Sequence, residues 1–241
     1  MSKFSFRLSP HYMSDIIWRQ IFEGIEPEIQ RASIRIEDIF AACNATRSKM
    51  AYNTGTISVA SALCLYAVTR FVRPTTIFEV GTFIGNSTLS MAAAMDINEA
   101  PNSRIFTCDG SNDTALPLEK VKTPVTAFPK TLSHDALGQL AVAPESRNID
   151  FLHIDGRIGE RDMGLFPALC DPQVVVALDD FEGGEKGVVN WNILRQHEFF
   201  KHHALVHPAP ERLMTQIGSR SFAHSVTALL IPVGKLVVTA Q

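Results

Sequence analysis

Apolar runs rich in β-branched and aromatic residues recur along this chain, and segments that can form helices or loops separate them. Such runs are typical of β-strands, and a nearly continuous one such as 174–178 fits a strand covered by helices on both sides. Strands that alternate with helices predict a mainly parallel sheet in a doubly wound α/β fold. Seven strands are expected, at residues 75–80, 104–109, 125–128, 149–155, 174–180, 203–206 and 226–231.

The last two predicted strands differ from the others in their connection. Pro208, Pro210 and Gly218 interrupt the segment between them, so a long crossover helix does not fit there. Strands joined without a crossover pair antiparallel. We therefore expect an antiparallel pair, with an antiparallel edge strand, at one side of the sheet.

The region ahead of Thr75 contains helical patterns, for example at residues 16–22 and 56–71, and no strand-like run. We interpret residues 1–72 as an N-terminal helical cap and residues 73–241 as an α/β core. With 241 residues, 46% of them hydrophobic, the chain suits one domain. The cap can cover the sheet, form part of a substrate lid or build a homodimer contact, and the pattern does not choose between these roles.

The run 75–88 combines the end of a strand with the start of a helix. Gly81 and Gly85 remove side chains from the turn, and Asn86 is expected to cap the helix that follows. Free N–H groups at a helix start favour a carboxylate or a phosphate. The two glycines are four residues apart, unlike the dinucleotide-binding pattern, and Glu79 would repel a pyrophosphate. The junction therefore suits a ligand with an amino-acid end.

Acidic residues stand at the carboxyl ends of four predicted strands. In an open α/β sheet, ligands bind outside these ends, near the point where strand order reverses. Carboxylates that converge there repel one another unless a cation, hydrogen-bond donors or water compensate them, so four such strands together favour a binding site. The residues are Glu79, Asp109, Asp155 and the pair Asp179-Asp180.

The segment Glu79-Val-Gly-Thr-Phe-Ile-Gly-Asn-Ser87 resembles the first motif of class I S-adenosylmethionine-dependent methyltransferases. It looks most like the small O-methyltransferases of the catechol and caffeoyl-coenzyme A type. The resemblance spans about residues 75–231, and it implies a Rossmann-like methyltransferase fold with S-adenosylmethionine as cofactor. The cofactor-binding residues that it implies are Glu79, Gly81, Thr82, Gly85, Ser87, Asp109, Ser133 and Asp155.

Asp109 has a specific expected role, because a carboxylate at the end of the second strand can accept hydrogen bonds from both hydroxyls of a ribose. In the resemblance it matches the acidic residue that binds the adenosine ribose. The sequence Asp109-Gly110 is also a turn signal, so a simple turn is the alternative. Ser133 falls loosely in the region where the family contacts the adenine ring.

A divalent metal is also implied. Asp155 matches the first metal-binding aspartate of catechol-type enzymes, Asp179 the second, and Asp180 their neighbouring asparagine. The Asp-Asp pair itself is similar to that of metal-dependent sugar O-methyltransferases of antibiotic biosynthesis. Oxygen ligands of this kind suit Mg²⁺ or another divalent cation. We therefore expect a metal site formed by Asp155, Asp179 and Asp180.

The sequence departs from the catechol pattern at the base. The lysine that catechol-type enzymes carry three residues after the first aspartate is replaced by Ile158. Lys186 is a candidate substitute if its surroundings lower its pKa, and a solvated loop lysine is its alternative role. The expected catalytic residues are thus Asp155, through the metal, and Lys186. His153 is expected to be a packed strand histidine.

The composition limits the kinds of partner that the protein is expected to bind. The net charge is −3, the isoelectric point is near 6.2, and lysine and arginine are scattered, which argues against nucleic acid or an anionic membrane. We find no apolar stretch typical of a signal peptide or a membrane span, so a cytoplasmic protein is expected. Four widely spaced cysteines form no metal or disulfide pattern, and Cys64 and Cys108 are expected to be buried free thiols.

Together these observations predict an enzyme that transfers a methyl group from S-adenosylmethionine to a hydroxyl of a small acceptor, assisted by a divalent metal. Two alternatives stay open. One is a metal-independent N- or carboxyl-methyltransferase, in which the acidic cluster binds an amine or acts as base. The other is a protein that binds S-adenosylmethionine without transferring its methyl group.

Overall fold

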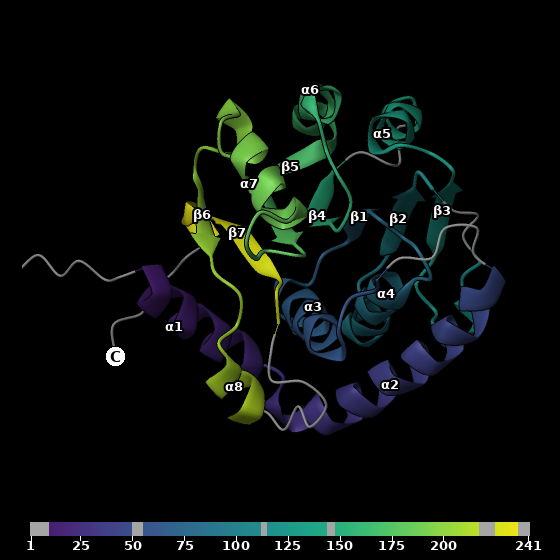
Figure 1. Cartoon of the computed structure of the whole chain (residues 1–241), viewed down its shortest axis with the longest axis vertical. Coiled ribbons are helices and arrows are strands. Elements are labelled where there is room, and N and C mark those ends of the chain that lie inside the picture. The colour runs from purple at the N-terminus through teal and green to yellow at the C-terminus, as the bar shows by residue number, and fades with distance from the viewer. Residues whose placement is uncertain (1–9, 50–54, 112–114, 144–147, 217–224, 236–241) are drawn as a thin grey trace, which may run out of the picture.

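The computed structural model describes residues 10–49, 55–111, 115–143, 148–216 and 225–235, and a seven-stranded sheet forms their centre (Figure 1). The strand order is β3-β2-β1-β4-β5-β7-β6. Every predicted strand is present. The strands are β1 (Thr76–Val80), β2 (Arg104–Asp109), β3 (Val125–Pro129), β4 (Ile149–Ile154), β5 (Cys170–Leu178), β6 (His203–Val206) and β7 (Ala228–Pro232).

Strand directions confirm the mainly parallel sheet. Strands β1 to β5 pair parallel to one another, and β7 pairs antiparallel to both β5 and β6. The antiparallel pair at one edge is therefore confirmed. One detail differs from the expectation, because the antiparallel strand β7 lies one position inside the edge and β6 is the edge strand.

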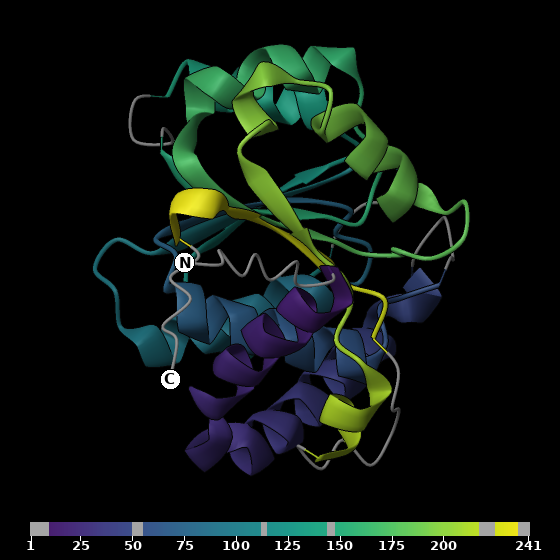
Figure 2. The same ribbon diagram turned by 90° about the vertical axis from the view of Figure 1, so that its left-hand side faces the viewer.

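Two layers of helices cover the sheet (Figures 1 and 2). Alternate residues of one strand face opposite layers, so Ile77 belongs to one hydrophobic cluster and Phe78 to the other. The layer on the Ile77 side contains α1 (Pro10–Glu23), α2 (Ile29–Thr46), α3 (Val59–Val72), α4 (Asn86–Asn98) and α8 (Glu211–Gln216). The opposite layer contains α5 (Ser133–Ala141), α6 (Glu160–Leu169) and α7 (Lys186–Leu194).

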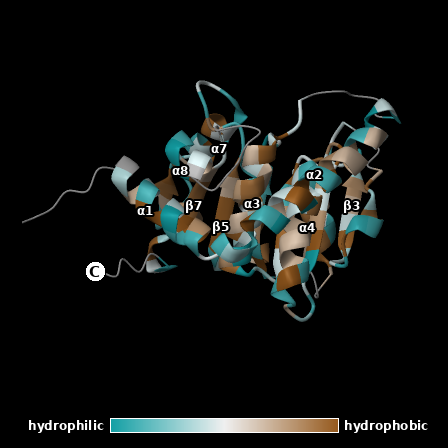
Figure 3. Ribbon diagram, turned by 90° about the horizontal axis from the view of Figure 1, so that it is seen from below, coloured by the Kyte–Doolittle hydropathy of each residue, from teal (hydrophilic) through white to brown (hydrophobic). Residues whose placement is uncertain are grey.

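The N-terminal helices share the core of the sheet. The two example patterns correspond to α1 and α3, and α3 begins after Ser58, whose hydroxyl accepts the backbone N–H of Ser61 at 3.0 Å. Helix α3 is apolar along its length and is buried between the sheet, α4 and α2 (Figure 3). Helices α1 and α2 thus extend one continuous hydrophobic cluster. A role of this region in a lid or a homodimer stays a prediction.

The cysteines agree with their expected state. Cys43, Cys64, Cys108 and Cys170 are all free and buried. Burial raises the pKa of the Cys64 thiol to about 12, so it stays protonated at neutral pH and packs as a small apolar group. In the described part of the chain, no helix has the length and apolar character needed to cross a membrane.

Candidate active site

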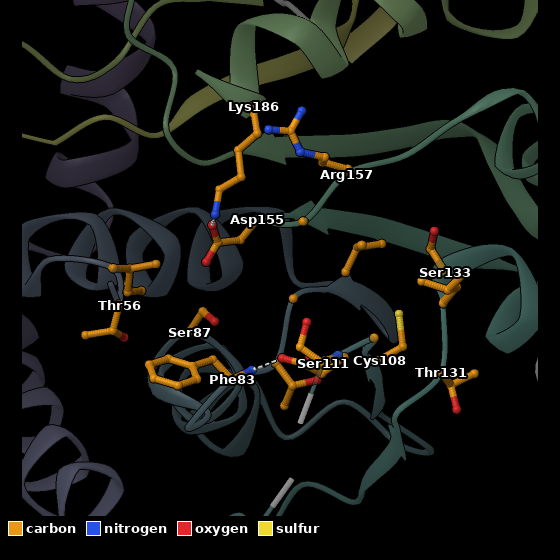
Figure 4. Close-up of a pocket in the computed structure, with 18 of the residues that line it drawn as sticks. Thr56, Phe83, Ser87, Cys108, Ser111, Thr131, Ser133, Asp155, Arg157 and Lys186 are labelled. Atoms are coloured by element: carbon orange, nitrogen blue, oxygen red, sulfur yellow. Dashed lines mark hydrogen bonds and ion pairs between the residues drawn. The ribbon is translucent and has the colours of Figure 1, made fainter. Parts of the chain in front are cut away.

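A cavity of about 340 Å³ opens at the carboxyl ends of β1, β2 and β4 (Figure 4). Its lining includes Gly81 after β1, Asp109 at the end of β2 and Asp155 after β4. Strand order reverses between β1 and β4, and this switch point is where open α/β sheets bind ligands. The volume lies within the usual range of small-molecule sites.

The turn after β1 brings backbone against backbone at the base of the cavity. Gly81 has a φ of 104°, and a Cβ there would lie 3.0 Å from the carbonyl carbon of Asp155 and from the nitrogen of Gly156. Glycine is therefore required both by conformation and by space. Helix α4 begins at Asn86, but its N-cap is Gly85, so the expectation that Asn86 caps the helix was wrong.

Asp109 is held rigidly at the rim of the cavity. Its Oδ2 accepts the backbone N–H of Phe83 at 2.7 Å, and its Oδ1 accepts the backbone N–H of Ser111 at 2.8 Å. The carboxylate also lines the cavity, and a carboxylate is a suitable acceptor for ligand hydroxyls. Thr82, Ser87 and Ser133 also line the cavity, as expected of ligand-binding residues.

Glu79 lies outside the cavity, which corrects the expectation that it contacts the cofactor. Its Oε1 accepts the hydroxyl of Ser87 at 2.6 Å and lies 2.9 Å from Nδ1 of His153. Its Oε2 accepts the hydroxyls of Thr107, at 2.6 Å, and of Thr88. The side chains of Glu79 and His153 are fully buried. Glu79 therefore links β1, β2, β4 and α4 beneath the cavity, and its oxygens are saturated by the protein.

His153 is the packed strand histidine that the sequence predicts, and its surroundings raise its pKa. Burial alone would lower its pKa, but the hydrogen bond and the charge of Glu79 outweigh burial and raise the pKa above its ordinary value. The raised pKa favours the charged form of the imidazole in this buried Glu79–His153 contact. Two neighbouring parallel strands place these residues opposite each other in register.

Two of the three candidate metal ligands, Asp155 and Asp180, contact one lysine, and the third, Asp179, contacts a threonine. Nζ of Lys186 lies 2.7 Å from Oδ1 of Asp155 and 3.1 Å from Oδ2 of Asp180 (Figure 4 shows Lys186 directed at Asp155). Asp179 is buried, and its Oδ1 accepts the hydroxyl of Thr227 at 2.8 Å. Across the described ranges, no three histidine, cysteine or acidic side chains form a group that could hold a metal ion.

The residues present therefore do not fit the expected metal. A divalent cation needs several oxygen ligands around one point, and here an ammonium already stands between the two nearest carboxylates. This corrects the assignment of Asp155, Asp179 and Asp180 as a joint metal site.

The same ion pairs decide which group can accept a proton. Burial would lower the pKa of Lys186, but Asp155 and Asp180 outweigh it and raise that pKa to about 12. An ammonium this stable is a poor general base at neutral pH, so the lowered pKa that the expected base role of Lys186 requires is not found. For Asp155, burial and the charge of Asp179 outweigh Lys186 and raise the pKa to about 7. Asp155 is the carboxylate suited to proton transfer near neutrality.

Sequence reasoning missed part of the cavity wall. Phe83, inside the glycine turn, lines the cavity, and so does Arg157, two residues after Asp155. Residues 55–57, just ahead of α3, close another side. Gly85, predicted to bind the cofactor, serves as the N-cap of α4. The position of Phe83 follows from the glycine turn. Residues 55–57 reach the cavity only through tertiary packing, which leaves no local signal in the sequence.

Comparison with known proteins places this geometry in a class. The sheet order, the helix layers and the cavity position define the class I methyltransferase fold. Residues 78–181, which run from β1 to just beyond β5, match a family model described as "Methyltransferase domain". This match, over a little less than half of the chain, agrees with the methyltransferase class that the sequence predicts. No relative among curated proteins matches the chain in sequence.

Three solved structures share the fold. The O-methyltransferase TomG from Streptomyces achromogenes, involved in tomaymycin synthesis and solved with SAM, is 18% identical, with a TM-score of 0.54 over 80% of this chain and 88% of that one. An O-methyltransferase from Bacillus cereus, solved with SAH, is 14% identical, with a TM-score of 0.54 over 82% and 90%. Cofactor-bound Rv0187 from MTB is 16% identical, with a TM-score of 0.52 over 95% and 99%. At such identities the likeness is one of fold.

Proposed function

We propose that the protein transfers a methyl group from S-adenosylmethionine to a hydroxyl of a small-molecule acceptor, with the cosubstrate bound in the cavity at the ends of β1, β2 and β4. The observation that carries the proposal is the fixed carboxylate of Asp109 at the rim, beside a glycine turn that admits a ligand close to the backbone. TomG and the Bacillus cereus protein are named as O-methyltransferases, which supports an oxygen acceptor.

Different residues of the cavity would contact different parts of the cosubstrate. Asp109 would accept hydrogen bonds from the ribose hydroxyls, since its carboxylate lines the cavity at the end of β2. Gly81, Thr82 and Ser87 would surround the methionine end, at the turn and the first residues of α4. Ser133, at the start of α5, lies on the wall where an adenine ring would extend.

The acceptor would bind at the opposite side, near Asp155 and Lys186 (Figure 4). When bound, S-adenosylmethionine supplies an electrophilic methyl group on sulfur. Transfer breaks the S–CH₃ bond, forms an O–CH₃ bond and releases the hydroxyl proton. The carboxylate of Asp155 takes up this proton, because its pKa of about 7 lets it exist unprotonated at neutral pH while still binding a proton readily.

Replacing Asp109 with alanine tests the cosubstrate site. We expect the affinity for S-adenosylmethionine to fall by about 1.5–3 kcal/mol, about tenfold to a hundredfold, because a charged acceptor of ribose hydrogen bonds is lost. Titration calorimetry measures the change. Asp135→Ala is the matched control, since Asp135 is exposed and lies outside the cavity lining. A folded wild-type protein that does not bind S-adenosylmethionine would refute the proposed function.

A further inference from the structure

We propose that the ammonium of Lys186 takes the position of the divalent cation that the sequence resemblance implies, and that it holds the acceptor oxygen in its place. Methyl transfer by this protein would then need no metal. The role toward the acceptor rests on the proposed function, whereas the exclusion of a divalent cation rests on the arrangement of the charges alone.

The contacts of Lys186 support this role. Its Nζ lies 2.7 Å from Asp155 and 3.1 Å from Asp180, so one unit of positive charge sits between two carboxylates. An ammonium carries three N–H donors, and these two ion pairs use two of them. The Lys186 side chain also lines the cavity and is 29% exposed. The third donor can therefore be directed at an oxygen atom of a bound acceptor.

The backbone around Lys186 fixes its position. Lys186 is the first residue of α7, and the next residue, Gly187, packs directly on the end of β5. A Cβ on Gly187 would lie 2.2 Å from the carbonyl oxygen of Asp179, so only glycine permits this approach. Asp180 adopts a left-handed backbone with φ of 51°. This turn separates the Asp180 carboxylate from that of Asp179, so Asp180 reaches Lys186 while Asp179 remains with Thr227.

The charges of Asp155, Asp180 and Lys186 partly compensate one another. Two carboxylates next to each other without a cation would repel, and Lys186 supplies the compensating charge from within the chain. A divalent cation at the same point would meet the ammonium at ion-pair distance and would have to displace it. An ammonium is also a point charge with rotatable donors, which allows it to follow the position of an acceptor oxygen.

Lys186→Met tests the proposal, with Mn²⁺ as the probe. Methionine keeps an unbranched side chain of similar length but removes the charge, which leaves the Asp155 and Asp180 carboxylates free to bind a cation together with water. We expect Mn²⁺ to bind Lys186→Met at least about tenfold more tightly than it binds the wild type, as measured by calorimetry and by electron paramagnetic resonance. Lys186→Arg keeps the charge and should bind Mn²⁺ as weakly as the wild type.

Arg157→Met is the matched control, because Arg157 is a second cationic residue that lines the same cavity. This variant loses the same charge and should gain no Mn²⁺ site. An equal gain in Arg157→Met would overturn the proposal, since the effect would then come from net charge alone. Circular dichroism and thermal melting verify that each variant is folded.

Two further measurements complete the test on the wild-type protein. Wild-type turnover should be unchanged after treatment with a chelator. Stoichiometric Mn²⁺ binding to the wild type with the affinity of Lys186→Met, or a chelator-induced loss of turnover that Mg²⁺ restores, would overturn the proposal. Calorimetry with S-adenosylmethionine separates the two hypotheses, because a failure to bind it would refute the proposed function and leave the Mn²⁺ comparison intact.

Discussion

Replacing Glu79 with alanine is expected to lower the free energy of unfolding by about 3–5 kcal/mol, the range typical of breaking a buried ion pair on one side. The substitution leaves the imidazole of His153 without its partner in a fully buried position, where it must either stay charged and unpaired or give up a proton. It also removes the acceptor of three hydroxyl donors, Ser87, Thr88 and Thr107. Denaturant unfolding followed by circular dichroism measures the loss.

Glu23→Ala is the control for this prediction. Glu23 is exposed in the last turn of α1, and its removal should change the unfolding free energy by about 0.5 kcal/mol or less. A loss below about 1 kcal/mol in Glu79→Ala would contradict the view that Glu79 holds the four elements together.

The same pair predicts a dependence of stability on pH. Because folding raises the pKa of His153, the ionic part of its stabilisation is fully present below the unfolded value of about 6.5 and is lost as pH rises through the folded value. The stability difference between the wild type and Glu79→Ala should therefore shrink at alkaline pH. The hydrogen bonds from the three hydroxyl groups do not titrate, so a part of the difference should remain.

The fold could be predicted because its signals are local. Each strand is a short run of β-branched and aromatic residues, and β3 and β5 need no knowledge of their neighbours to be found. The glycine turn and Asp109 could also be located from local sequence. Each lies at the end of a strand, and the end of a strand fixes the position of the residues there. The cavity at the ends of β1, β2 and β4 follows from these strand ends and from the rule for parallel sheets.

The direction in which each carboxylate points could not be predicted from its position at the end of a strand. Glu79 shares its strand face with Ile77, which turns it toward α4 and away from the cavity. Its partners Thr107 and His153 come from the strands on either side, and their register is a property of the assembled sheet. Sequence reasoning treated every acidic strand end as part of one site, whereas the register assigns Glu79 to the core.

Lys186 was recognised as a candidate, but the ion pairs that raise its pKa could not be predicted, for a similar reason. A lysine in a glycine-rich loop can be solvated, basic or paired, and its partners decide which. Two of the residues expected to bind a metal, Asp155 and Asp180, are its partners. The local sequence 179–187 contains the loop but does not reveal that α7 begins at Lys186, which is what directs the side chain toward Asp155.

Asp155→Asn is expected to lower kcat by about a hundredfold to ten-thousandfold, the usual contribution of a general base. Asparagine keeps the size of the side chain but cannot take up the hydroxyl proton of the acceptor. A screen of hydroxyl-bearing acceptors with labelled methyl donor provides the assay, and calorimetry should show S-adenosylmethionine binding within about threefold of the wild type. Asp180→Asn is the matched control, because Asp180 shares the Lys186 contact but lies outside the cavity lining, and its kcat should fall by less than about tenfold.

The pH profile distinguishes a base from a residue that only positions Lys186. With a pKa of about 7, Asp155 loses its activity as a base when pH falls below that value, so wild-type kcat should decrease by about tenfold for each further pH unit. Asp155→Asn should lose this acid limb, whereas Asp180→Asn should keep it. A wild-type profile that stays flat between pH 5 and 8 would show that another group takes the proton, and Asp155 would then act only as the partner that holds the ammonium in place.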